Sequence, residues 1–264
     1  MSEHQDTIGP LTRTVRDGAI LLQAIAGYDP RDNYTSAIPG GTVPDFVAAC
    51  QLSALSGKRL GVPRNVLSLL VSNATQQIIT SFNQSLHDLE AAGATIVENT
   101  NFPAVEELEQ YTLPTIILNA DFVVNIRTYL SYLSYNPNNI TTLADLRHFT
   151  QNSFLEDYPL RDTGLWDQAL KNWNNTSPDF WPAYQRNRYF GEEGGLLGAL
   201  KRHDLDAVVI PTHFSSSLAA TVGAPIVSVP MGYYSKDSPI TTDSWRLVET
   251  APNIPYVTRP FQSA

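Results

Sequence analysis

Apolar residues recur at helical spacing near the start of the chain, directly after Thr14. The positions that share one helix face are Val15, Ala19, Leu22, Ile25 and Ala26. This spacing predicts a helix that begins at Thr14 and ends at Gly27. Residues 28–41 contain prolines and a Gly-Gly pair, so they are predicted to form a loop.

The strongest local pattern lies in residues 58–99. Residues 59–63 have the composition of a short strand, and residues 95–97 of a second one. Between them, one face of a predicted helix carries Ala74, Ile78, Ile79, Phe82, Leu86 and Leu89. Ser72 or Asn73 is expected to cap this helix, and Gly93 to end it in a left-handed conformation. The pattern predicts a βαβ unit with two parallel strands and the helix on one face.

The middle of the chain, residues 104–198, is predicted to be mostly helical, with Pro114 interrupting a long apolar stretch. Further helices are predicted at residues 143–151, 165–173 and 180–202. Aromatic residues of this region can either line a ligand pocket or pack between helices, and packing is the more common use. They are Tyr129, Tyr132, Tyr135, Trp166, Trp173, Trp181, Tyr184 and Tyr189.

Two apolar runs near the C-terminal end predict further strands. Residues 206–212 are almost continuously apolar, which is typical of a strand buried on both faces. A Ser-rich turn and an Ala-rich helix follow, and residues 226–230 are predicted to form the next strand. From residue 234 onwards no periodicity remains, so a surface tail is expected.

Composition and charge narrow the class of protein. The chain has 264 residues, of which 42% are apolar and 16% charged, as in globular domains. A net charge of −9 would repel a nucleic-acid backbone or an anionic membrane, so neither is expected as a partner. The single cysteine, Cys50, excludes an internal disulfide framework and indicates a reducing compartment. Because residues 1–5 lack a signal pattern and no long apolar run occurs, a cytoplasmic location is expected.

Candidate catalytic and binding residues are sparse. The sequence has no Gly-x-Ser-x-Gly motif, and its Ser-rich stretch has the features of a polar helix start. Thr212, Ser215 and Ser216 are predicted to line any substrate pocket. The 5 histidines never pair at helical ligand spacing and no phosphate-binding loop occurs, so neither a metal nor a cofactor is expected. Cys50 and His213 are alternative reactive residues, although no neighbour in sequence would activate either.

Charged pairs are interpreted as surface features. Glu106-Glu107 and Glu192-Glu193 are neighbours on predicted helices, so the two carboxylates of each pair do not face each other. Lys201 and Arg202, beside His203, lie at a predicted helix end, where cations are favoured by the helix dipole.

Six short blocks in a fixed order are spread over most of the length of the chain. The first block, residues 5–15, reads Gln-Asp-Thr-Ile-Gly-Pro-Leu-Thr-Arg-Thr-Val. The other five blocks are residues 25–32, 60–64, 205–212, 223–233 and 248–255. Together they resemble the part of amidase signature family enzymes, particularly fungal ones, that follows the catalytic region.

The resemblance implies an α/β fold with a mixed β-sheet covered by helices, here a partial amidase-signature fold that lacks its N-terminal catalytic part. It divides the chain into a partial amidase domain, residues 1–255, and a divergent tail, residues 256–264. Family members hydrolyse a carboxamide to a carboxylate and ammonia or an amine. They use a serine nucleophile, a second serine in a cis peptide and a lysine base, all supplied before the block that begins at Gln5. Because no counterpart of that segment precedes Gln5 here, we expect this chain to be inactive by itself.

The resemblance also implies partners. Without the early part of the fold, sheet edges and apolar helix faces would be exposed, which predicts homo- or hetero-association through a sheet edge. A small-molecule amide is the expected ligand if a pocket remains. The alternative is a non-catalytic binding or scaffold relative that pairs with an intact amidase.

Overall fold

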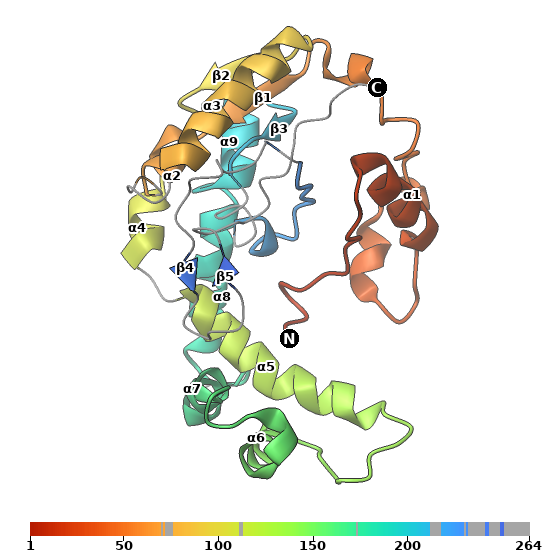
Figure 1. Ribbon diagram of the computed structural model, residues 1–264, viewed down its shortest axis with the longest axis vertical. Coiled ribbons are helices and arrows are strands. Elements are labelled where there is room, and N and C mark those ends of the chain that lie inside the picture. The colour runs from red at the N-terminus through yellow and green to blue at the C-terminus, as the bar shows by residue number, and fades with distance from the viewer. Residues whose placement is uncertain are drawn as a thin grey trace.

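The structure, a computed structural model, is drawn in Figure 1. It describes residues 1–69, 71, 76–110, 113–172, 174–211, 218–229, 231, 241–242 and 249–250.

The first helix, α1, spans Val15–Ile25, close to the prediction. The Thr14 hydroxyl accepts a hydrogen bond of 3.1 Å from the Asp17 backbone N–H and so caps the helix. Ala26 is the C-cap of the helix, one residue before the predicted stop at Gly27. The predicted loop, residues 28–41, contains short 3-10 helices at Asn33–Ala37 and Pro39–Gly41, and a third follows at Leu52–Leu55.

The predicted βαβ unit is confirmed. Strand β1 (Arg59–Val62) pairs in parallel with β2 (Thr95–Glu98), with Arg59 opposite Thr95. Helix α3 (Gln76–Ala91) connects them after a short helix α2 (Arg64–Ser68) that the pattern did not predict. Gly93 has φ +99° as expected, because the chain must turn sharply from α3 into β2. The shared core is made by Val62, Leu67, Phe82 and Leu86, with Ile79, Leu89 and Ile96 against them.

The third strand of the sheet is shorter than predicted. Strand β3 (Ala207–Val208) pairs in parallel with β1, so the order is β2-β1-β3. The prediction was a mixed sheet, whereas both strand pairs described in this sheet are parallel. Ala207 is exposed and residues 208–210 are only half-buried, so the expected burial on both faces is wrong. Within the described residues β3 has a strand neighbour only on its β1 side, which explains the incomplete burial.

The predicted strand at residues 226–230 is also wrong for its described part. Residues 224–229 belong to no described strand, and Ile226, Val227 and Val229 are at least half exposed. By contrast, the predicted tail contains an antiparallel strand pair, β4 (Thr241–Thr242) with β5 (Glu249–Thr250).

The helical middle part is confirmed, with one correction. Its helices are α4 (Val105–Gln110), α5 (Leu113–Ser131), α6 (Leu143–Asn152), α7 (Gly164–Asn172), α8 (Phe180–Gly191) and α9 (Leu196–His203). Pro114 lies in the first turn of α5, where a missing N–H costs nothing. The single helix predicted over residues 180–202 is divided into α8 and α9. Residues 192–194 form a turn there, and a Cβ on Gly195 would collide with the Phe190 carbonyl.

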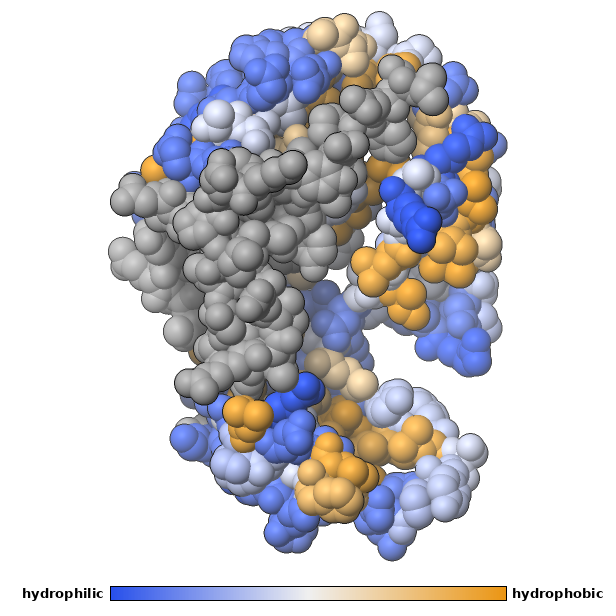
Figure 2. Space-filling view, viewed as in Figure 1, coloured by the Kyte–Doolittle hydropathy of each residue, from blue (hydrophilic) through white to orange (hydrophobic). Residues whose placement is uncertain are grey.

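Helix packing builds two cores beside the sheet. Ile117 and Ala120 of α5 pack on Phe180, Ala183 and Phe190 of α8. Near the other end of α5, Ile126 packs with Leu143 of α6 and Ala169 of α7. Figure 1 shows a curved molecule, with the sheet and α3 at one end, α6 and α7 at the other, and α1 apart from both. Figure 2 shows that the surface is hollowed between the part that carries α1 and the rest. No helix in the described ranges is long and apolar enough to cross a membrane.

Candidate functional site

A polar cluster joins the first residues of the chain to helix α5. Asp121 of α5 is only 1% exposed, and it accepts a short hydrogen bond from the Ser2 hydroxyl. His4 Nδ1 lies 2.9 Å from Asp121 Oδ2 and 3.0 Å from Oδ1. Residues 2–6 form a tight turn, in which the Ser2 N–H donates to the Asp6 carboxylate at 2.8 Å and the Asp6 N–H to the Ser2 carbonyl at 2.9 Å. The buried carboxylate therefore fixes both side chains and the turn that carries them.

The electrostatics of the cluster follow from the Asp121 carboxylate. Its hydrogen bond raises the pKa of His4 above the ordinary value for histidine, against burial, which lowers that pKa. Because a carboxylate only accepts, the Nδ1 atom of His4 carries the proton. Nε2 has no hydrogen-bond partner in the described part of the chain. A neutral His4 can therefore accept a proton or a hydrogen bond at Nε2, in the way that a carboxylate-oriented imidazole does.

Two aromatic rings of α8 lie beside His4. The His4 ring centroid is 4.8 Å from that of Tyr184 and 6.3 Å from that of Phe180. Trp181 stands edge-on to Tyr184 at 5.5 Å and is largely exposed. Burial raises the pKa of Tyr34 above its ordinary value, and interactions with Tyr184, Glu3, Asp121 and Asp32 raise it further. The arrangement combines a polar, oriented imidazole with partly exposed aromatic surface.

Other predicted aromatics serve different purposes. Trp166 packs edge-on against Phe122 in the α5–α7 core, at 6.4 Å between ring centroids. Tyr189 lies under the Arg186 guanidinium at 4.5 Å. Tyr129, Tyr132 and Tyr135 are exposed. Trp173 lies outside the described residues. Of the described aromatic residues named from the sequence, Tyr184 contacts the His4 ring, and Trp181 stands against Tyr184.

The site residues predicted from sequence, Thr212, Ser215 and Ser216, lie outside the described residues, as does His213. Cys50 is half-buried, and its Sγ lies 3.4 Å from the Phe46 carbonyl. The prediction missed Ser2, His4 and Asp121. His4 and Asp121 are 117 positions apart, and the available signal was a lone aspartate inside an apolar helix.

The charged pairs have mainly structural contacts. Glu107 forms an ion pair with Arg186, and Glu192 with Arg188, so neither carboxylate pair supplies an acid beside a base. The basic residues at 201–203 occupy the last turn of α9, as predicted. No group of three or more His, Cys, Asp or Glu side chains in the described part of the chain is placed to hold a metal ion.

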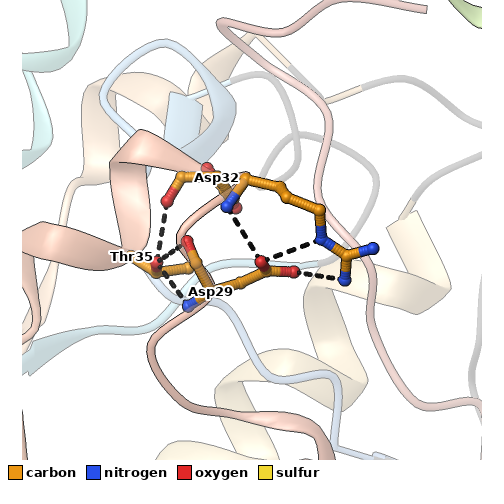
Figure 3. A network of polar contacts seen from close by, with 4 residues as sticks. Asp29, Asp32 and Thr35 are labelled. Carbon is orange, nitrogen blue, oxygen red and sulfur yellow. Dashed lines mark hydrogen bonds and ion pairs between the residues drawn. The ribbon is translucent and has the colours of Figure 1, made fainter.

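The block at residues 25–32 forms a closed turn (Figure 3). The Thr35 hydroxyl donates to the carbonyls of Asp29 and Asp32, at 3.0 and 2.7 Å, and accepts from the Asp29 N–H at 2.9 Å. Arg31 donates hydrogen bonds from Nε and Nη2 to the Asp29 carboxylate, at 3.1 and 3.0 Å. This contact lowers the pKa of Asp29. The network closes on itself, so we assign these residues to the shape of the loop after α1.

Comparison with known proteins decides the family. The sequence profile described as Amidase matches residues 1–248. The chain belongs to the Amidase family. A protein of Arthroderma benhamiae named "Putative amidase" is 52% identical over 256 residues, which are 97% of this chain and 43% of that protein. A "Probable amidase" of Arabidopsis thaliana is 29% identical and is covered to 49% of its length.

Solved structures agree with this assignment. The peptide amidase of Stenotrophomonas maltophilia is 28% identical, with a TM-score of 0.72 over 88% of this chain and 48% of that chain. The amidase chain described here therefore has the fold of about half of a solved amidase structure. It likewise spans about half the length of the curated relatives it matches, or less.

Proposed function

We propose that these 264 residues are part of a serine amidase that hydrolyses a carboxamide to a carboxylate and ammonia or an amine. We further propose that they are inactive alone, because the nucleophile and base come from the part of an amidase that they do not represent. The observation that carries this proposal is the pairing of a family match over residues 1–248 with coverage of only 43% of the Arthroderma relative.

The chemistry of amide hydrolysis supports a division of roles. A serine nucleophile needs a base within hydrogen-bond reach and donors for the oxyanion. In the resemblance described above, those groups precede the block that begins at Gln5. The described residues offer the complementary features, which are an oriented imidazole at His4 and exposed aromatic surface at Trp181 and Tyr34. In this proposal the aromatic surface receives the apolar part of an amide substrate.

The test uses the Arthroderma relative as donor of the missing part. The 264-residue chain is assayed for ammonia release from a panel of hydrophobic primary amides, alone and fused to the relative's residues outside the matched 256. No turnover is expected from the chain alone, and turnover is expected from the fusion. The donor part alone serves as the control and is expected to be inactive.

Two results would contradict the proposal. Turnover by the purified chain alone would place a nucleophile within these residues, and Cys50→Ala would then be the first variant to assay. A folded fusion without activity on any amide of the panel would remove the assignment to amide hydrolysis.

A second proposal is a non-catalytic relative that binds an amide or an intact amidase. It is favoured by the exposed apolar residues of α1 and of residues 226–229, which offer an association surface. Calorimetric titration with a hydrophobic amide, and separately with the Stenotrophomonas peptide amidase, tests it. Binding by the chain together with an inactive fusion would support this second function, whereas no heat with either partner would rule it out.

A further inference from the structure

Several asparagines of the chain stand two residues before a serine or threonine, with no proline between. This Asn-x-Ser/Thr pattern, the sequon, is the acceptor sequence for N-linked glycosylation, and it is used where it lies on the surface of a protein. The asparagines concerned are Asn33, Asn73, Asn83, Asn139, Asn174 and Asn175. Asn73 lies outside the described residues, so the structure compares the other sequons.

Two of these asparagines are partly withdrawn from the surface. Asn83 lies on α3, is half-buried, and accepts a hydrogen bond of 2.8 Å from Arg64 Nη1 through its side-chain Oδ1. A glycan on Asn83 would therefore compete with a contact that joins α3 to α2. Asn175 is also half-buried.

Two further sequons are closed by their own hydrogen bonds. The Asn174 Oδ1 accepts from the Thr176 N–H and hydroxyl, at 2.9 and 2.6 Å, so the amide and the hydroxyl of this sequon bind each other. In the sequon of Asn33, the half-buried Thr35 hydroxyl makes the hydrogen bonds of the closed turn in Figure 3. Neither sequon presents a free amide together with an exposed hydroxyl.

Asn139 differs from all of these. It belongs to the loop between α5 and α6, which Figure 1 draws on the outline of the molecule. Its N–H closes a turn on the Asn136 carbonyl at 3.2 Å, and its φ is +52°. Both Asn139 and Thr141 are exposed, and the Thr141 hydroxyl donates only to Asp145 at the surface, at 2.9 Å. Within the described residues, the side-chain amide of Asn139 makes no hydrogen bond, so the acceptor nitrogen is free.

The surface beside Asn139 has room for a sugar. A groove of about 490 Å³ is lined by Asn139 and Ile140 together with His148, Phe149 and Asn152 of α6. This volume lies within the range of small-molecule sites. The groove offers one aromatic face, an imidazole and side-chain amides, which can pack on a sugar ring and hydrogen-bond its hydroxyl groups. A first sugar attached to Asn139 therefore meets open, partly polar surface.

We propose that Asn139 is an N-glycosylation site of this protein. Its Nδ2 atom forms a bond to the anomeric carbon of an N-acetylglucosamine, while the bond from that carbon to the diphosphate of a lipid-linked oligosaccharide donor breaks. The lipid diphosphate leaves and Nδ2 loses one proton. A eukaryotic oligosaccharyltransferase carries out this transfer, and the relatives from Arthroderma and Arabidopsis are eukaryotic proteins.

This inference is independent of amide hydrolysis, because no residue of the sequon takes part in that proposal. It places the protein in the secretory pathway instead of the cytoplasmic location expected from residues 1–5.

Peptide mass spectrometry of the protein purified from its own source tests the proposal. Treatment with peptide N-glycosidase in water labelled with heavy oxygen converts each glycosylated asparagine to a labelled aspartate. The label is expected at position 139 and not at position 83. An unlabelled Asn139 would overturn the proposal and agree with a cytoplasmic location. Equal labelling at positions 83 and 139 would mean that the folded structure does not select the acceptor, which also overturns the argument.

A matched pair of variants tests the acceptor itself, in the 264-residue chain secreted from yeast behind an added secretion signal. Asn139→Asp removes the acceptor amide, and aspartate still tolerates a positive φ. Asn138→Asp is the control, because it adds the same charge at the neighbouring exposed position, which is not part of a sequon. Intact masses before and after deglycosylation are expected to show one glycan fewer in Asn139→Asp than in Asn138→Asp. Circular dichroism checks that both variants fold, and equal numbers of glycans in the two would overturn the proposal.

Discussion

Two parts of the molecule carry the same kind of sequence pattern and reach different structures. Residues 58–99 and residues 205–231 each contain two apolar runs separated by helical spacing. The first part forms β1, α3 and β2 with a closed core, whereas the second forms a two-residue strand and an exposed segment that belongs to no described strand. The comparison shows that an apolar run becomes a strand only where a partner strand lies beside it.

The partner of each run explains the difference. β1 is paired on both sides, by β2 and β3, and is so closely covered that a Cβ on Gly61 would come within 2.8 Å of the Thr100 hydroxyl. Residues 226–229 have the better β-composition but no described strand beside them. Backbone groups of a strand are satisfied only by a neighbour, so composition alone does not build a sheet.

The largest expected change in the free energy of unfolding comes from a substitution in the βαβ core, and a matched substitution in the exposed segment is compared with it. Phe82→Ala removes a buried ring of the βαβ core and is expected to lower the free energy of unfolding by about 3–5 kcal/mol. Val227→Ala in the exposed segment is expected to change it by less than about 0.5 kcal/mol. Urea unfolding followed by circular dichroism measures both. Equal losses would mean that residues 226–229 are part of the same core.

The stability of a third region, the cluster of Asp121, His4 and Ser2, can be compared with that of these two parts. Asp121→Asn removes the anionic acceptor of His4 and Ser2, and about 1–3 kcal/mol of stability is expected to be lost. Because the folded-state pKa of His4 is raised, its extra stability is fully present below the unfolded value of about 6.5 and is lost as pH rises through the folded value. The difference between wild type and variant should therefore shrink with rising pH. His87→Gln, on the exposed face of α3, is the control and should leave the pH dependence of the free energy of unfolding unchanged. If the pH dependence of Asp121→Asn runs parallel to that of the wild type, the prediction is refuted.

Each of the two parts contains a turn at a glycine with positive φ, and the effects of substituting these glycines can be compared. Gly93 ends the connection from α3 to β2 with φ +99°, and Gly223 precedes the exposed segment with φ +64°. A Cβ at Gly93 would lie 3.2 Å from the Ser56 Cα, whereas one at Gly223 would have nothing within 4 Å. Gly93→Ala is expected to cost about 2 kcal/mol and Gly223→Ala about 1 kcal/mol, both measured by thermal unfolding. A larger loss at Gly223 would show that its block is the more tightly constrained one.

The last prediction concerns an ion pair at the end of β2, where a small loss of stability is expected. Arg64 binds the Glu98 carboxylate through Nε and Nη2, at 2.6 and 2.5 Å, and thereby lowers the pKa of Glu98. The stabilisation is present above the unfolded pKa of about 4.3 and is lost as pH falls through the folded value. Because the pair is largely solvent-exposed, Glu98→Gln is expected to cost less than about 1 kcal/mol at pH 7 in urea unfolding. A loss comparable with that of Phe82→Ala would contradict this.

Much of the local structure could be predicted because its causes are local. The Thr14 hydroxyl caps α1 within three residues, and Gly93 turns the chain between α3 and β2. The break at Gly195 was missed, because the collision that requires glycine there, with the carbonyl of Phe190 in α8, arises only once residues 192–194 have formed their turn. In the candidate site, the aromatic residues Trp181 and Tyr184 were predicted as pocket or packing residues, but His4 and Asp121 were not, since nothing in their spacing links them.

The sequence by itself determined the family of this protein and the elements whose caps, turns and apolar faces lie within a few neighbouring positions. The ordered blocks between Gln5 and Pro255 were sufficient for the family, because each preserves the local requirements of one piece of the fold. Only the tertiary structure decided that Asp121 meets His4 and Ser2 and that residues 226–229 remain exposed. Both outcomes depend on which groups the fold brings together, and a strand or a buried carboxylate is stable only when its partner is present.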